Sequence, residues 1–125
     1  MNSPQAIENQ NIVELPCLLI PLKGRFLLLP TVTVAEMAPY MAVRMESNTP
    51  DWYLGVYHWR DQAVPLLSFE VINGEANPMA TSNSRIAVIN NTRICDSLPF
   101  IALVTQGIPR LARVNAEEIS EISTA

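Results

Sequence analysis

The 125-residue sequence predicts an all-β fold, an antiparallel barrel or sandwich of about seven short strands. Two observations lead to this prediction. Short apolar runs rich in β-branched and aromatic residues recur along the chain, and polar or glycine-containing turns separate them at short intervals. About half of the residues are hydrophobic, which is enough for one folded domain of this length.

The first predicted elements form a hairpin. Residues 1–15 are mostly polar and are expected to be a flexible tail, with a single domain over residues 16–125. Cys17–Leu22 and Arg25–Leu29 are predicted strands joined by a turn at Lys23-Gly24. Both strands are almost continuously apolar, a pattern that favours strands covered on both faces.

The middle of the chain predicts a second hairpin. In Tyr53–Trp59 the side chains alternate between two faces, and the chain returns as Ala63–Leu67 after a turn at Asp61-Gln62. Ser68 is a suitable N-cap for a short helical turn through Ile72.

The other predicted elements are again short apolar segments separated by polar turns. Thr31–Glu36 is expected to be a strand with Val32 and Val34 on one face. The remaining predictions are strands at Arg85–Ile89, Pro99–Thr105 and Ile108–Val114 and an acidic helical segment at Asn115–Ile122.

Composition argues against several classes of protein. The formal net charge is −4, and the chain has no basic stripe, so neither nucleic acid nor an anionic membrane surface is expected as a partner. No apolar run approaches the ~20 residues of a spanning helix, and no secretory signal is present, which predicts a cytoplasmic protein without direct membrane insertion. Cys17 and Cys95 are widely separated and are expected to be free thiols, with no disulfide framework.

Residues for catalysis are scarce. His58 is the single histidine, and a lone histidine without a cluster is more often structural or at an interface than catalytic. One histidine and two isolated cysteines cannot supply a zinc site, and no phosphate-binding or nucleophile motif occurs. We therefore expect no enzyme, no metal and no cofactor, with a small ligand-binding barrel or hydrolase as the alternative from a different class.

One constellation stands out as a docking surface. Four aromatic residues lie close together and lead into Arg60, which is predicted at a hairpin tip: Trp52, Tyr53, Tyr57 and Trp59. Aromatic residues and arginine are enriched at the centres of protein interfaces. The two tryptophans fit a core role equally well, whereas a guanidinium is rarely fully buried.

This segment resembles the CheW family, whose signature reads TP-x-aromatic-x-x-G-V-x-x-L-R-G-x-x-V-P-hydrophobic. The matching positions, without a gap, are Thr49, Pro50, Trp52, Gly55, Val56, Arg60, Val64, Pro65 and Leu66. Val34-Ala-Glu36-Met37 is similar to the end of the family's second strand. The resemblance covers residues 17–120, and the opening hairpin looks closest to the accessory CheW-like proteins of type IV pilus chemosensory systems.

The resemblance implies two small SH3-like β-barrels that share a core. It also implies a non-catalytic adaptor and scaffold in chemotaxis signal transduction. Such an adaptor couples the tip of a methyl-accepting chemoreceptor to the regulatory domain of a CheA-type histidine kinase, and the likeness to pilus systems implies a role in twitching motility. By motif position, the partner surfaces would include Val34, Glu36, Gly55, Trp59, Arg60 and Asp61. The resemblance implies that Arg60 pairs with a carboxylate of the partner and that Glu36 pairs with a basic residue of the partner.

The sequence departs from the family pattern at several positions. Asp61 replaces the glycine after the arginine, and Trp59 stands where leucine is usual. The sequence also stops soon after Ile119, where typical members continue through another hairpin and a final strand. This implies an incomplete second barrel, a truncated boundary or strands supplied by a partner. An open β edge would favour self-association, so a self-assembling or kinase-sequestering module is the alternative within the same fold.

Overall fold

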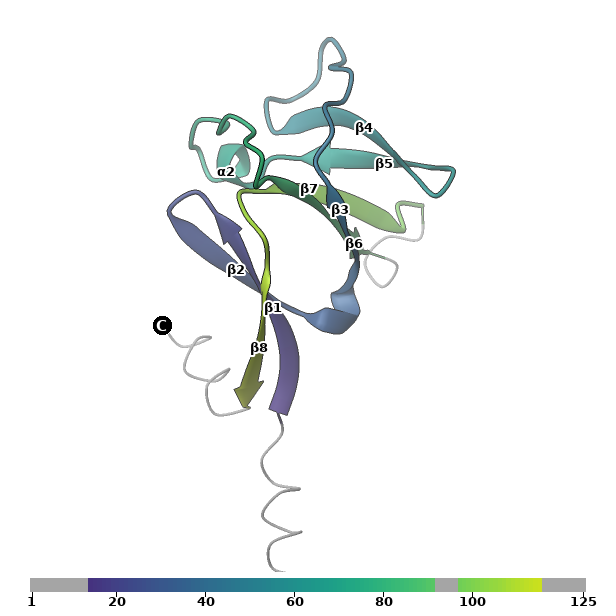
Figure 1. Cartoon of the computed structure of the whole chain (residues 1–125). Helices are drawn as coiled ribbons and strands as arrows, with labels where there is room; N and C mark the ends of the chain where they lie inside the picture. The colour runs from purple at the N-terminus through teal and green to yellow at the C-terminus, as the bar shows by residue number, and fades with distance from the viewer. Residues whose placement is uncertain (1–13, 92–96, 116–125) are drawn as a thin grey trace, which may run out of the picture.

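The computed structural model describes residues 14–91 and 97–115, which form two β-sheets with little helix (Figure 1). The all-β prediction is therefore confirmed. The strands within these ranges are β1 (Glu14–Leu22), β2 (Arg25–Pro30), β3 (Val34–Pro39), β4 (Tyr53–Trp59), β5 (Gln62–Leu67), β6 (Arg85–Asn90), β7 (Phe100–Thr105) and β8 (Arg110–Asn115). The short helices are the 3₁₀ turn η1 (Thr31–Thr33) and the single-turn α2 (Phe69–Ile72).

The smaller sheet contains the two ends of the described chain. Its strand order is β2-β1-β8, and both pairings are antiparallel. Gly24 has a φ of +75° in the tight β1–β2 turn, a conformation that glycine adopts without steric cost. In Figure 1 this sheet lies below and to the left of the larger one.

The larger sheet has the order β3-β6-β7-β5-β4. β4 and β5 form a hairpin, whereas β5 pairs with β7 in parallel at Leu66↔Ala102 and Leu67↔Leu103. β6 and β7 thus lie between β3 and the β4–β5 hairpin, although they follow both in the sequence. The two outer strands of this sheet are β3 and β4.

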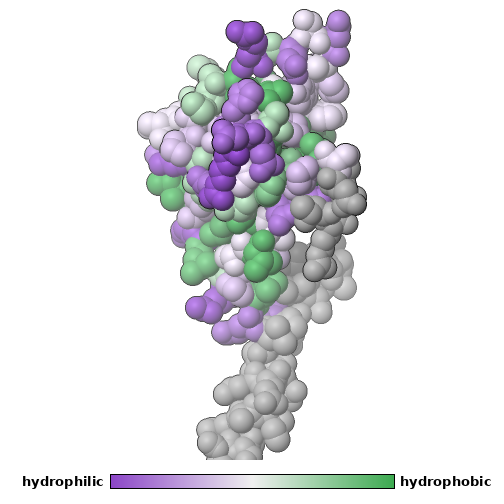
Figure 2. All heavy atoms as spheres, turned by 90° about the vertical axis from the view of Figure 1, so that its right-hand side faces the viewer, coloured by the Kyte–Doolittle hydropathy of each residue, from purple (hydrophilic) through white to green (hydrophobic). Residues whose placement is uncertain are grey.

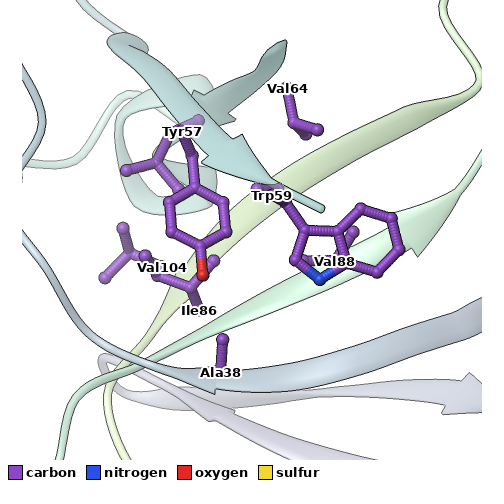
Figure 3. Close-up of a cluster of buried hydrophobic side chains, with 9 residues drawn as sticks. Ala38, Tyr57, Trp59, Val64, Ile86, Val88 and Val104 are labelled. Atoms are coloured by element: carbon purple, nitrogen blue, oxygen red, sulfur yellow. The ribbon is translucent and has the colours of Figure 1, made fainter. Parts of the chain in front are cut away.

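Two apolar clusters make up the core. One belongs to the larger sheet, where Tyr57 and Trp59 extend from β4 toward Ile86 and Val88 of β6 (Figure 3). The other cluster joins the two sheets, because Ile20 and Leu22 of β1 pack with Ala87 of β6. The sheets therefore share buried apolar contacts, which stabilise their mutual arrangement.

Three local predictions were wrong. Thr31–Thr33 is a 3₁₀ turn in which the Thr33 hydroxyl donates to Pro30 O at 2.7 Å, a local bond that competes with strand pairing. Val32 is consequently 80% exposed and does not share a buried face with Val34. β2 is not covered on both faces, because Phe26 is 57% exposed.

Other boundaries moved by a few residues. β1 begins at Glu14, inside the predicted tail, and Glu14 pairs with Asn115 of β8. The Ser68 cap is confirmed, since its hydroxyl accepts from Val71 N. Cys17 is buried as predicted and is a free thiol. Cys95 and most of the predicted segment 115–122 lie outside the described residues.

Candidate functional site

The β4–β5 turn presents two charged residues to solvent. Arg60 and Asp61 have φ values of 48° and 62°, and Trp59 pairs with Gln62 on either side of them. Positive φ at both central residues is the signature of a type I′ hairpin turn. The tip is therefore Arg60-Asp61, one residue earlier than the predicted Asp61-Gln62 turn.

A carboxylate on β3 holds this tip from across the sheet. Glu36 Oε1 accepts the Trp59 indole N–H and an Arg60 guanidinium N–H, and both donor–acceptor distances are 3.0 Å. The Arg60 guanidinium also lies over the Trp59 ring, 4.7 Å from its centroid, which gives a cation–π contact. We name these three residues the Glu36–Arg60 cluster.

The cluster shows how the larger sheet curves. Glu36 is on β3 and Trp59 is on β4, and these strands are at opposite edges of the sheet. Their side chains can meet only because the sheet curls until its edges approach each other. Trp59 is 6% exposed and contacts Phe100 edge-to-face with ring centroids 4.8 Å apart, so the indole is anchored in the core.

The negative charge of Glu36 also affects the pKa of the buried residue Tyr57. Burial raises the pKa of the Tyr57 hydroxyl, and the negative charge of Glu36 raises it further. Both effects disfavour the tyrosinate form, because a low-polarity environment and a nearby carboxylate each oppose a second negative charge.

The residues predicted at partner surfaces fall into two groups. Arg60 and Asp61 are exposed, and the turn that carries them points toward the viewer of Figure 2, where strongly hydrophilic side chains gather in the upper part of the molecule. Glu36 and Val34 are half-buried, and Val34 packs against the cluster between the sheets.

Gly55 and Trp59 are buried. Gly55 has a φ of +142°, and a Cβ at this position would overlap Arg44 O and lie 2.8 Å from Val43 Cγ2. These two residues can therefore influence a partner by positioning the 43–44 segment and the Arg60 side chain. Their roles, like those of the exposed residues, stay predictions.

A groove that the sequence did not reveal runs along β4. It has a volume of about 530 Å³ and lies between residues 41–46 and the outer part of β4. We name it the β4 groove, and its lining residues are Met41, Ala42, Val43, Arg44, Glu46, Val56, Tyr57 and His58. Residues 41–46 have no regular secondary structure, so no periodic pattern could have placed them beside the strand.

The described residues offer little for catalysis. His58 is exposed on β4, and no hydrogen bond or ion pair within the described ranges involves its imidazole. No group of three or more His, Cys, Asp or Glu side chains in these ranges could hold a metal ion. No helix within them is long and apolar enough to cross a membrane.

Comparison with known proteins identifies the family of this chain. No curated protein matches the chain. Among solved structures, the scaffolding protein TtCheW from Thermoanaerobacter tengcongensis matches with a TM-score of 0.71 and 13% identity. The match covers 84% of this chain and 65% of TtCheW, so the chain corresponds to less than two thirds of that protein. The CheW-like fold predicted from the sequence is thereby confirmed. Residues 16–125 also match the family of CheW-like domains, and the chain belongs to that family.

Proposed function

We propose that this chain is a non-catalytic adaptor that couples the signalling tip of a chemoreceptor to the regulatory domain of a CheA-type histidine kinase in the cytoplasm. The observation that supports this most directly is a CheW-like domain over residues 16–125. Its hairpin tip exposes a fixed guanidinium at the arginine position of the family signature.

The Glu36–Arg60 cluster suits Arg60 to recognition of a carboxylate. The Arg60 side chain is 66% exposed although it donates to Glu36, so other N–H groups of its guanidinium face solvent. The contacts with Glu36 and Trp59 restrict the rotamers of a long side chain before any partner arrives. Such preorganisation lowers the entropic cost of binding and favours a planar, bidentate contact.

Signal transmission in this proposal is linkage between binding sites. An adaptor transmits a change of state only if its contacts with the partner differ in free energy between the two states. The Asp61 carboxylate beside Arg60 places a negative charge where the family signature has glycine. We propose that this charge contributes to partner choice by repelling acidic groups next to the carboxylate that Arg60 binds.

Capture by purified partners tests the proposal. We expect the wild-type chain to bind a CheA-type kinase regulatory domain and to retain a chemoreceptor signalling fragment in a ternary complex. Arg60→Ala should weaken at least one of these contacts by tenfold or more, about the effect of losing a central arginine anchor. Arg110→Ala on β8, an exposed arginine of the other sheet, is the matched control. Undiminished binding by Arg60→Ala would refute the Arg60 role, and failure to bind either partner would refute the adaptor.

An alternative within the fold is self-association or capture of a kinase without a receptor. The outer edges of β2 and β8 have no partner strand within the described residues, and Leu111 on β8 is 63% exposed. Light scattering at several concentrations would distinguish this alternative, because strand-mediated assembly predicts a mass that rises with concentration.

We further propose that the adaptor acts in a type IV pilus chemosensory system that controls twitching motility. The support is the resemblance of the opening hairpin to ChpC, an accessory CheW-like protein of such systems. A deletion strain that keeps flagellar chemotaxis and loses directed twitching would support this output, and the reverse phenotype would exclude it.

A further inference from the structure

We propose that residues 116–125 dock on the outer face of the smaller sheet, the face that points away from the larger sheet. This contact goes beyond the proposed adaptor function and does not depend on it. Leu18 and Ile20 of β1 pack toward the larger sheet, so the residues that alternate with them point outward. Residues directly opposed on paired strands share a face, so the outer face includes Leu15, Cys17 and Leu19 of β1, Leu28 of β2, and Ala112 and Val114 of β8.

The outer face is apolar, although neither apolar cluster of the described residues contains its members. Its one charged residue is Arg110, which lies opposite Leu19. An antiparallel sheet with one solvated face normally alternates apolar and polar side chains along each strand. β1 is apolar on both faces from Leu15 to Leu22, so its outer face has the composition of a covered surface.

The buried side chains locate the cover. Cys17 is 2% exposed on the central strand, and Val114 is 7% exposed on β8, an outer strand of the sheet within the described residues. Leu111, which points to the opposite face of β8, is 63% exposed, and Phe26, at the turn end of the outer face, is 57% exposed. A further segment must therefore lie over Cys17 and Val114, at the end of the sheet where β8 finishes.

Residues 116–125 start at that end, directly after β8. Ala116, Ile119 and Ile122 recur at a three-residue spacing, which places them along one side of a helix. Ten helical residues extend about 15 Å, and three neighbouring strands span about 10 Å, so the segment is long enough to cross β8 and reach over Cys17. Its apolar side would then replace water on the outer face.

Charge favours this segment over residues 1–13, which precede β1 at the same end of the sheet. Arg110 is exposed, and within the described ranges no hydrogen bond or ion pair involves its guanidinium. Residues 1–13 carry one acidic side chain, whereas residues 116–125 carry three and no basic one: Glu117, Glu118 and Glu121. The acidic segment therefore complements the positive charge of the outer face.

Alkylation of the Cys17 thiol in the full chain tests the contact, with Cys95→Ser in every variant so that Cys17 is the single cysteine. The probe is iodoacetamide at about pH 8, which reacts with exposed thiolates. We expect slow labelling of this parent protein, and labelling faster by about tenfold or more for Ile119→Asp, because a charge opposes docking of the apolar side. Thr124→Asp adds the same charge on the polar side of the helix, so this matched control should label as slowly as the parent.

A spin label gives a second measurement that does not depend on global stability. With both native cysteines replaced, a nitroxide attached at Thr124→Cys should broaden the amide signals of residues 15–19 more than those of β4. Ile119→Asp should remove this difference. Circular dichroism verifies that the variants are folded.

Several outcomes would overturn the inference. They are rapid labelling of Cys17 in the parent protein, equal labelling of the parent and Ile119→Asp, and uniform broadening by the spin label. Protection that rises with protein concentration would assign the cover to a second copy of the chain and would overturn it as well. None of these outcomes bears on capture of the kinase or receptor, so the two proposals fail independently.

Discussion

Glu70 of α2 and Lys23 of the β1–β2 turn are joined across the two sheets, with Glu70 Oε2 accepting the Lys23 backbone N–H at 3.0 Å. Glu70 is 1% exposed, and its other oxygen is buried without a hydrogen-bond partner in the described residues. Gln106 N, directly after β7, donates to Pro21 O of β1 at 2.8 Å. The turn end of the β1–β2 hairpin is thus fixed to the larger sheet by polar contacts as well as by apolar packing.

Replacing Glu70 should destabilise the domain. We expect Glu70→Ala to lower the free energy of unfolding by about 2–3 kcal/mol, because the Lys23 N–H loses its acceptor and a cavity forms. Glu70→Gln keeps an acceptor and the side-chain volume, so it should lower the free energy of unfolding by less. Urea denaturation measures both changes. Equal losses for the two variants would show that the Lys23 contact is not the source of the stability.

Two substitutions of Glu36 should distinguish how much each of its two hydrogen bonds contributes to stability. The ion pair with Arg60 is partly exposed and is worth at most about 1 kcal/mol, whereas the buried Trp59 indole N–H depends on an acceptor. Glu36→Gln retains an acceptor oxygen and should therefore be milder than Glu36→Ala, which we expect to cost about 1–3 kcal/mol. Tryptophan fluorescence during urea denaturation reports both variants. A larger loss for the glutamine variant would contradict this order.

Alkaline pH should destabilise the domain through Tyr57. Its pKa in the folded state is raised above the ordinary value of 10.0, first by burial and then by Glu36. Above the unfolded pKa the unfolded chain binds fewer protons than the folded one, so stability is complete below about pH 10 and falls as pH rises through the folded pKa.

Tyr57→Phe should flatten this alkaline decline. The measurement is the free energy of unfolding between pH 8 and 11, with tyrosinate absorbance recorded in parallel. Tyr53, whose pKa is raised mainly by its hydrogen bond with Glu46, contributes in the same direction, so Tyr53→Phe should also flatten the decline, and the variant with both changes should flatten it most. An unchanged slope in the Tyr57→Phe variant would contradict the assignment to Tyr57.

Gly55→Ala should lower the free energy of unfolding far more than Gly24→Ala. Both glycines have positive φ, but a Cβ at Gly55 meets Arg44 O and Val43, while a Cβ at Gly24 meets nothing within 4 Å. We expect Gly24→Ala to cost about 1 kcal/mol and Gly55→Ala clearly more, about 3 kcal/mol. Thermal and urea unfolding compare the pair. Similar losses at the two sites would show that the 43–44 segment moves away from β4 without cost.

The sequence was most informative where a local pattern determines structure. Alternation in Tyr53–Trp59 predicted a strand with two faces, and the structure buries one of them from Gly55 onward. The Ser68 cap was evident from residue type alone. It failed at Thr31–Thr33, where a threonine hydroxyl bonds to the backbone of Pro30 and ends the extended conformation.

The candidate site was less accessible to such reasoning. Arg60 was identified as an exposed tip residue, but its pairing with Glu36 depends on the curl of a sheet whose edge strands are β3 and β4. A strand-by-strand pattern carries no information about that curvature. The family resemblance predicted that Glu36 and Arg60 would each meet a charge on a partner, which stays a prediction, and the structure shows that the two residues contact each other.

The strand order of the larger sheet has a consequence for synthesis. β6 and β7 lie between β3 and β5, so a nascent chain that has emerged only through residue 84 holds the β4–β5 hairpin without β7, the second neighbour of β5. One edge of β1 likewise stays unpaired until β8, the last described strand, is available. Non-local strand pairing forms slowly, so we expect the β4–β5 hairpin to stay without its further sheet neighbours until residues 85–105 are available.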